Sequence, residues 1–563
     1  MNSKAHRSSL LACATLMAAL VVGCTSGTSG ESAADPTVSL AAADAGPLAI
    51  PSGSSAQVSA AVSAALFESS PAVIVVDSDT AADVVETATD LGLPVLAVSP
   101  SPDADSGDGA SQPTSATASS TSSSGEPTGT ETNSGTETNA GTQTNTNSGS
   151  SSATGTEDSS DAEQTVTQIL ADEIERLGAT HALVLGDQAR EATADLDLEV
   201  VTDAGDLPDI DKASPRPTTA VLTAGPEVSQ LDETALDAAA ASAGAAGATF
   251  IQTTSGDPRG DTSAIDTLSS VHPNRVIGVG DGLGSEDEFV QRVAVASTGV
   301  QLPGGGQLVT PGKVYVAMYG HPGSSALGVL GEQGLDESVD RARSLAAPYR
   351  DLTSSTVIPT FEIITTVALG SATEEGDYTR EVEPEFIQPW IERAQAEGMY
   401  VILDLQPGRD DLLDHAQHYE SLLSYPNVGL AIDPEWKLGP NERPLQQIGS
   451  VDAEEINRVG DYLATLTREK DLPEKLFVLH QFRLDMITNR AEVNTSHDEL
   501  QVLIHVDGQG AQGDKTKTWN ALQVNQPANV VWGWKNFYDE DRPMLNPERT
   551  MQVEPTPVMI SYQ

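Results

Sequence analysis

The clearest indication of the fold class is the segment Val428-Gly429-Leu430-Ala431-Ile432-Asp433-Pro434-Glu435-Trp436. Its first five residues are apolar without alternation, which is typical of a strand buried on both faces of a parallel sheet. Two carboxylic acids, Asp433 and Glu435, follow that strand directly. A strand of this kind needs similar neighbours, and the sequence on both sides provides them.

Eight runs of this type, including the one quoted, recur between Lys313 and the C-terminus. They occupy residues 314–319, 357–363, 399–404, 428–433, 476–480, 502–507, 529–534 and 558–562. Helix-like segments or loops separate them. Eight short parallel strands in about 250 residues is the count and length of a (β/α)8 barrel. We therefore predict a TIM-type barrel over residues 301–563, after the glycine-rich boundary at residues 302–307.

The helices of this barrel are predicted at residues 336–347, 385–397, 410–423 and 453–470. Asp452 stands where the last of these needs a capping side chain. No helix is predicted after the eighth strand. We expect the helix predicted over residues 286–296, ahead of the first strand, to cover that gap.

The strand ends carry the chemistry, because functional groups of such barrels lie at the C-terminal ends of the strands. These ends offer His321, Glu362, Asp404, Asp433, Glu435, His480, His505, Asp507 and Trp534. Hydrolysis of a glycosidic bond needs one carboxyl group to protonate the leaving oxygen and a second to act as base, nucleophile or stabiliser. The Asp-x-Glu pattern after the fourth strand resembles the acid/base placement in several retaining glycosidase barrels. We predict Asp433, Glu435 and Asp507 as catalytic residues.

The remaining strand-end residues are predicted to bind the substrate. Trp436 and Trp534 would offer faces for stacking against sugars, whereas the others would offer hydrogen bonds: His321, Glu362, Asp404, His480 and His505. Structural roles stay open beside these. Asp433 could cap its loop, Glu435 could pair with Lys437 or Arg443, and Asp404 could replace Asp507 as the second carboxylate.

Two other functional classes stay open. Three histidines, His321, His480 and His505, with Asp404 or Asp433, could form the divalent metal site of a metal-dependent hydrolase. No His-x-His or Glu-x-x-His spacing supports it, so we expect neither a metal ion nor a cofactor. Alternatively, the barrel is a catalytically inactive adhesion or scaffold module. Lys535 favours this alternative, because glycosidases with two glutamates carry their nucleophile after the seventh strand.

The N-terminus predicts export and a lipid anchor. Lys4 and Arg7 precede an apolar stretch, residues 10–22, that is too short to span a bilayer. Cys24 directly follows Val-Val-Gly, a placement that resembles the bacterial lipobox. We therefore predict a signal peptide over residues 1–23, lipidation of Cys24, and location on the outer face of the cytoplasmic membrane.

The net charge and the cysteine content exclude several kinds of partner and bond. The net charge of −53 makes nucleic acid and anionic lipid headgroups poor partners. Cys13 leaves with the signal peptide and Cys24 is the lipidation site. No cysteine then remains for a disulfide or for a metal site.

Residues 24–47 are small and polar and predict a flexible tether. An α/β domain is predicted over residues 48–300. Residues 100–162 inside it are almost wholly Ser, Thr, Gly, Asn, Glu and Asp, a composition that predicts disorder. Strands and helices continue on both sides of this tract, so it is interpreted as an insertion within one domain.

The α/β domain repeats itself, as a strand-helix-strand-helix-strand unit over residues 72–186 and again over residues 220–280. The phrases at residues 91–98 and 176–186 resemble the type 2 cell-wall-binding repeat of Gram-positive surface proteins. Gly186-Asp187 and Gly280-Asp281 replace the usual Gly-Gly of that family. The resemblance implies side-by-side βαβ units that adhere to wall polymers.

Three phrases of the barrel, around His321, Asp404 and Asp433, resemble those of uncharacterised actinobacterial surface lipoproteins. The sequence therefore predicts a surface lipoprotein with a glycosidase-like barrel. The expected partners are a cell-envelope polysaccharide or a peptidoglycan-associated glycan, and the membrane through the lipid anchor. Nucleic acid is not expected.

Overall fold

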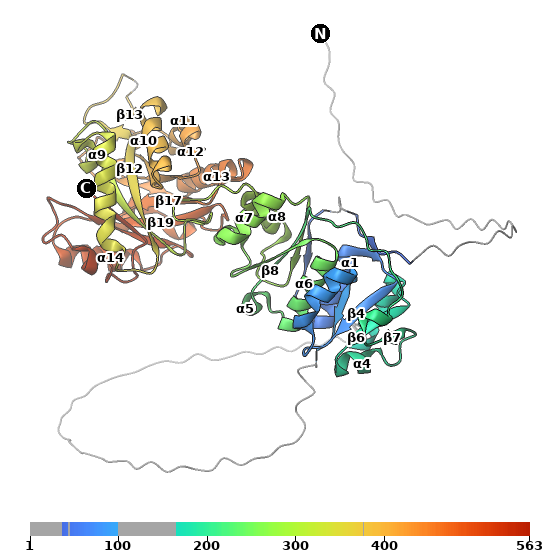
Figure 1. Cartoon of the computed structure of the whole chain (residues 1–563). Coiled ribbons are helices and arrows are strands. Elements are labelled where there is room, and N and C mark those ends of the chain that lie inside the picture. The colour runs from blue at the N-terminus through green and yellow to red at the C-terminus, as the bar shows by residue number, and fades with distance from the viewer. Residues whose placement is uncertain (1–35, 43–45, 100–164, 375) are drawn as a thin grey trace, which may run out of the picture.

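The computed structural model describes residues 36–42, 46–99, 165–374 and 376–563. Figure 1 shows two α/β domains, an N-terminal one in blue to green and a barrel in yellow to red. The predicted signal peptide, Cys24 and the predicted insert at residues 100–162 lie outside the described residues. Within these ranges, no helix is long and apolar enough to cross a membrane.

The described residues of the N-terminal domain form two four-stranded parallel sheets, in which three strands of each share one order. The first has the order β5 (Val95–Ala97), β4 (Ala72–Val76), β6 (His181–Leu185), β7 (Glu199–Val201). The second has the order β9 (Thr249–Thr253), β8 (Thr219–Ala224), β10 (Arg275–Val279), β2 (Leu48–Ile50). In each unit the first strand along the repeat lies between the second and the third. The repeat predicted from the sequence is therefore present as two units with the same strand order.

The described residues on both sides of the tract at residues 100–162 belong to the same sheet. β4 pairs with β5, which precedes the tract, and with β6, which follows it. The tract is thus inserted within one sheet and does not link two domains.

The predicted tether ends earlier than expected. Val38 and Leu40 are buried in the core of the N-terminal domain. β1 (Ser39–Leu40) pairs antiparallel with β3 (Phe67–Ser69). The composition of residues 24–47 suggested a tether, but Val38 and Leu40 pack in the domain core, so the N-terminal domain begins before the predicted boundary at residue 47.

In the described part of this domain, eight helices surround the sheets. They are α1 (Ser55–Leu66), α2 (Val84–Leu91), α3 (Val166–Leu177), α4 (Asp187–Thr193), α5 (Pro226–Ser229), α6 (Glu233–Ala245), α7 (Thr262–Val271) and α8 (Glu286–Ser297). α6 packs against both α1 and α2. Its buried residues include Ala238, Ala239 and Ala241, whose short side chains allow close helix packing.

The barrel is closed by eight parallel strands. They are β11 (Lys313–Gly320), β12 (Thr356–Ala368), β14 (Tyr400–Leu405), β15 (Val428–Ile432), β17 (Lys475–His480), β19 (Leu500–Val506), β20 (Val531–Asn536) and β21 (Met559–Tyr562). β11 pairs with β12 on one side and with β21 on the other, which closes the ring. All eight predicted strands are present, so the TIM-type barrel is confirmed.

Helices cover the outer face of the barrel. They are α9 (Leu335–Ala346), α10 (Pro384–Ala396), α11 (Leu412–His418), α12 (Glu420–Leu423), α13 (Ala453–Glu469), α14 (Gln512–Leu522) and α15 (Pro547–Thr550). As predicted, Asp452 caps α13, by accepting a hydrogen bond from the Glu454 amide at 3.0 Å. β12 runs beyond its predicted end and pairs with β13 (Thr379–Glu381) at the rim.

The gap beside the eighth strand is not covered by α8. Phe289 and Val293 of α8 are buried in a core cluster of the N-terminal domain instead. The outer face of β11 and β21 is covered by Tyr349, whose hydroxyl lies 2.6 Å from that of Tyr562, and by Met544 and Met551. The expectation that residues 286–296 replace the eighth helix was therefore wrong.

The junction between the domains is packed. Leu302 and Val309 are buried in the apolar lower interior of the barrel, beside Tyr315, Tyr400 and Met559. Asp498 of the barrel forms ion pairs with Arg292 at 2.6 Å and with Arg259 at 2.8 Å. The glycine-rich boundary is thus folded against the base of the barrel, which leaves the opposite, C-terminal mouth for function.

Candidate functional site

A cavity of about 500 Å³ lies at the C-terminal mouth of the barrel. The following residues line it: Tyr319, Ala326, Leu327, Ile364, Ala368, Gln406, Glu435, Trp436, Ile448, Phe482, Asp507, Gly508, Gln509, Lys535, Phe537 and Gln563. Three of these, Glu435, Trp436 and Asp507, were predicted as site residues. The cavity combines two carboxyl groups and one amine with aromatic walls.

Glu435 is held in the cavity by the turn that follows β15. Asp433 caps the short helix η6 (Pro434–Trp436) by accepting from the Glu435 amide at 3.3 Å. The Glu435 carbonyl accepts from the Gly449 amide at 2.8 Å, and a Cβ at residue 449 would lie 2.7 Å from that carbonyl oxygen. The turn is therefore fixed from both sides.

The structural alternative for Glu435 is not observed. Lys437 pairs with Glu455 at 2.5 Å. Across the described ranges, no ion pair joins Glu435 to Lys437 or Arg443. The Glu435 carboxyl group is available to the cavity.

Asp433 has the capping role that the sequence left open. It is buried at the strand end and does not line the cavity. Burial and the nearby Glu435 carboxyl group raise the pKa of Asp433 well above its ordinary value. Asp433 is thus placed to support Glu435 rather than to contact a ligand in the cavity.

Asp507 is anchored from below by His480. Its Oδ2 lies 3.1 Å from His480 Nδ1. Burial acts to raise the pKa of Asp507, but the hydrogen bond and charge of His480 outweigh it and lower that pKa below its ordinary value. Asp507 is a carboxylate at the cavity floor.

The pKa of Glu435 is shifted in the opposite direction to that of Asp507. Burial, and next the charge of Asp507, raise the pKa of Glu435 to about 7. A carboxyl group with this pKa is protonated in about half of the molecules at neutral pH, and this protonated form can donate its proton. The cavity therefore presents one carboxyl group that can still carry a proton near neutral pH and one that is ionised.

Hydrogen bonds connect two cavity-lining side chains, Tyr319 and Gln406, to Asp404 beneath the cavity floor. Tyr319 donates from its hydroxyl to Asp404 Oδ2 at 2.8 Å, and Gln406 donates to the Tyr319 hydroxyl at 3.2 Å. Burial, opposed by the charge of His480, raises the pKa of Asp404 to about 6. Asp404 faces this network and does not line the cavity, so Asp507 is better placed as the second carboxylate.

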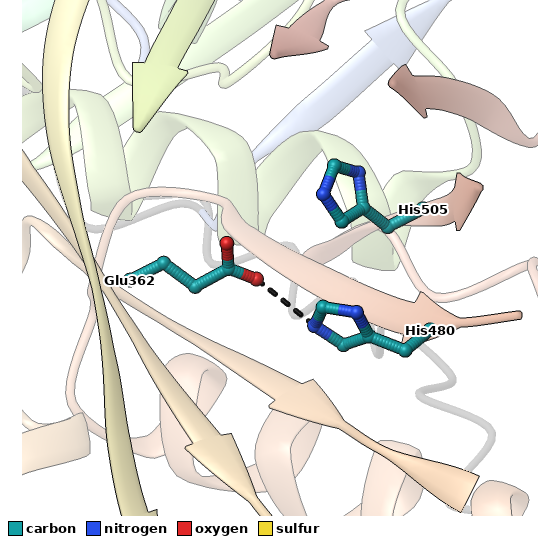
Figure 2. A group of neighbouring side chains, drawn as sticks. All are labelled: Glu362, His480 and His505. Carbon is teal, nitrogen blue, oxygen red and sulfur yellow. Dashed lines mark ion pairs between the residues drawn. The ribbon is translucent and has the colours of Figure 1, made fainter. Parts of the chain in front are cut away.

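Glu362, His480 and His505 meet in the barrel interior (Figure 2). All three are fully buried, and none lines the cavity. His321 lies elsewhere, beside the rim, where its Nδ1 is 3.1 Å from the Ile364 carbonyl oxygen and its ring stacks on Phe386. The predicted substrate-binding histidines are thus split between a buried cluster and the rim.

Trp534 does not face the site. Its side chain is 2% exposed and packs outside the barrel with Trp519 and Trp532. Successive side chains of a strand point to opposite faces. Because Lys535 faces the interior, its neighbour Trp534 faces the helix layer, and the expectation that Trp534 stacks against a sugar was wrong.

Several side chains of the cavity were not predicted from the sequence, chiefly Tyr319, Gln406, Phe482, Lys535 and Phe537. Lys535 is the most informative of them, because its Nζ lies 3.6 Å from the centroid of the Tyr319 ring. A lysine inside an apolar strand signals a polar interior, and that signal was available in the sequence.

The chain matches no protein-family model, no curated protein and no solved structure. The function is therefore inferred from the fold and from the side chains at the barrel mouth.

Proposed function

We propose that this protein is a surface lipoprotein whose barrel hydrolyses a cell-envelope glycan. One observation carries the proposal: Glu435 and Asp507 line the same cavity at the mouth of a TIM-type barrel. Glu435, with its pKa of about 7, acts as the general acid that protonates the leaving oxygen. Asp507 acts on the sugar as the second carboxylate that hydrolysis requires.

The aromatic walls suit a sugar ligand. Trp436 lies at the end of η6, next to Glu435, and Phe482 and Phe537 add further apolar surface. Sugar rings present apolar C–H faces that pack on aromatic rings, while Gln406 and Lys535 offer hydrogen-bond donors. A glycan bound here would lie across both carboxyl groups.

The direct test incubates the full chain with a panel of purified wall polysaccharides and peptidoglycan and measures release of reducing ends. Hydrolysis that is lost in Glu435→Gln supports the proposal. If no member of the panel is cleaved, or if Glu435→Gln cleaves as fast as the unmodified chain, the enzymatic proposal is wrong.

The pH profile gives a sharper result. Only the protonated form of Glu435 is an acid, so the rate is expected to stay high below pH 7 and to fall tenfold per pH unit above it. Any activity that remains in Glu435→Gln should lack this alkaline limb. An alkaline limb that persists in the variant would assign the titration to another group.

A non-catalytic glycan-binding barrel is the second candidate. It is favoured by Lys535, which lines the cavity from β20, the seventh barrel strand, where a second glutamate would be expected. A protein of this kind would bind the glycan panel without cleaving it. Cosedimentation with the insoluble wall polysaccharide, lost in Trp436→Ala, would support this function.

The anchor predicts where the protein acts. Lipidation of Cys24 would hold both domains at the outer face of the membrane, and the repeats of the N-terminal domain would place the barrel against wall polymer. Cys24→Ser should leave the protein unprocessed or release it into the medium, measured by detergent-phase partition of cell fractions. Unchanged partition of Cys24→Ser into the detergent phase would contradict the lipoprotein assignment.

A further inference from the structure

Three metal-ligating side chains converge inside the barrel, directly below the cavity. Glu362 comes from β12, His480 from β17 and His505 from β19, and one donor atom of each lies within 4.8 Å of the others. Figure 2 shows the carboxylate of Glu362 facing both imidazole rings. The closest pair is Glu362 Oε1 and His480 Nε2, which are 2.9 Å apart.

Most of the converging atoms have no hydrogen bond. Among the described residues, both carboxylate oxygens of Glu362, Nε2 of His480 and Oδ1 of Asp404 are buried without a hydrogen-bond partner. The 2.9 Å approach of His480 to Glu362 is an ion-pair contact outside hydrogen-bonding geometry. Buried polar atoms left in this way cost free energy unless another group satisfies them.

We propose that Glu362, His480 and His505 bind a divalent transition-metal ion, with Zn²⁺ as the best fit, and that Asp404 completes the ligand set. Asp404 Oδ1 lies 3.8 Å from His480 Nε2. Two imidazole nitrogens and two carboxylates suit Zn²⁺ in tetrahedral geometry, whereas Mg²⁺ and Ca²⁺ prefer oxygen ligands alone. The metal proposal does not rest on the glycan-hydrolysing function proposed above, because its ligands and its test do not involve a glycan.

The surrounding contacts orient these ligands as metal sites require. The other oxygen of Asp404, Oδ2, accepts from Tyr319, which leaves Oδ1 for the ion. His480 Nδ1 lies 3.1 Å from Asp507, so a metal on Nε2 would leave Nδ1–H to donate to that carboxylate. Carboxylates that hold the second nitrogen of a ligating histidine are a recurrent feature of such sites.

The ring of His505 is fixed as well. Ser561 Oγ lies 2.6 Å from His505 Nε2, in a hydrogen bond that a metal ion on this nitrogen would replace. On the neighbouring strand, a Cβ at Gly533 would lie 2.2 Å from His505 Nδ1, so only glycine leaves room for this ring. The backbone of β20 is thus shaped around His505.

The site is closed, which assigns the ion a structural and positioning role. None of Glu362, His480, His505 and Asp404 lines the cavity. With four protein ligands no coordination position faces a substrate, as in structural zinc sites. The ion would hold Asp507 in place at the cavity floor through His480.

The test measures the metal content of the full chain, purified without chelator, by inductively coupled plasma mass spectrometry. One equivalent of a transition metal per chain is expected. After chelation, Zn²⁺ at a hundred times its Kd should raise the Tm of the barrel by about 5–10 °C. If the chain holds no stoichiometric metal and its Tm responds to neither Zn²⁺ nor chelator, a protonated His480 bridges Glu362 and Asp507, and the metal proposal is wrong.

Matched variants localise the ion. Glu362→Gln and Asp404→Asn keep the shape of each side chain but should weaken Zn²⁺ binding by at least about 10–100-fold. His415→Gln is the control, because His415 is a buried histidine that contacts Glu381 at 2.8 Å outside the barrel interior, and it should retain the metal. Full metal retention in both site variants would place the ion elsewhere.

These measurements do not depend on activity. A chain that holds Zn²⁺ but cleaves no glycan contradicts only the proposed function, and a metal-free chain that cleaves glycan contradicts only the metal site. If Glu362→Gln fails to fold, Asp404→Asn and the response of the unmodified chain to Zn²⁺ still decide the question.

Discussion

Glu435→Gln is expected to slow glycan hydrolysis by about 10²–10⁴-fold, the range that a positioned general acid contributes. The substitution removes the proton donor and leaves the size of the side chain nearly unchanged. The backbone of residue 435 keeps both contacts, because its carbonyl still accepts from the Gly449 amide and its N–H still donates to Asp433 Oδ1, so the turn should hold its shape. The measurement is the initial rate of reducing-end release, with the Tm recorded in parallel.

Two companion variants sharpen this result. Asp507→Asn should cause a loss of similar size, and the double variant should be little worse than either single one, because the two groups act in one reaction. Glu454→Gln, an exposed glutamate in the first turn of α13, is the control and should leave the rate unchanged. Equal rates for Glu435→Gln and Glu454→Gln would remove Glu435 from the mechanism.

The barrel was predictable because its strands are buried on both faces. A run such as Val428–Ile432 is apolar throughout, and only a parallel sheet covered by helices buries both faces. The helix boundaries were predictable from other signals, namely the periodicity of apolar residues and capping residues such as Asp452. The location of the cavity then follows from the direction of the strands.

Because both faces of each strand are buried, the sequence could not predict which side chains point into the barrel. A strand without alternation does not reveal which of Trp534 and Lys535 points inward. Strand ends predicted the position of Glu435 and Asp507, since both follow their strands. They could not predict the depth of a side chain, so Glu362, His480 and His505 were expected in the cavity although they lie beneath it.

Contacts between segments far apart in the chain also could not be predicted from the sequence. α8 carries an apolar face that fits either domain, and only the fold assigns it to the N-terminal core. Val38 and Leu40 are two apolar residues in a polar segment, too few to signal a strand. In both cases the partner surface lies far away in the chain.

Trp534→Ala is expected to lower the free energy of unfolding by about 3–5 kcal/mol, the usual cost of removing a large buried aromatic side chain. Trp534 packs with Trp519 at a centroid distance of 5.4 Å, and Lys515 Nζ lies 4.9 Å from its ring centroid. Its indole N–H donates to Asn536 Oδ1 at 2.9 Å. The substitution thus leaves a cavity between β20 and α14, and the Tm of the barrel should fall by about 6–20 °C.

Trp436→Ala is the matched comparison, because Trp436 lines the cavity and is only partly buried. Its loss should weaken glycan binding and change the Tm little, whereas Trp534→Ala should lower the Tm and leave the affinity of the remaining folded chain unchanged. Denaturation followed by circular dichroism, together with glycan cosedimentation below the Tm, separates the two effects. A side chain in the helix layer can affect the cavity only through the stability of the strand that carries Lys535. Weaker glycan binding at an unchanged Tm in Trp534→Ala would therefore contradict the placement of Trp534 outside the barrel.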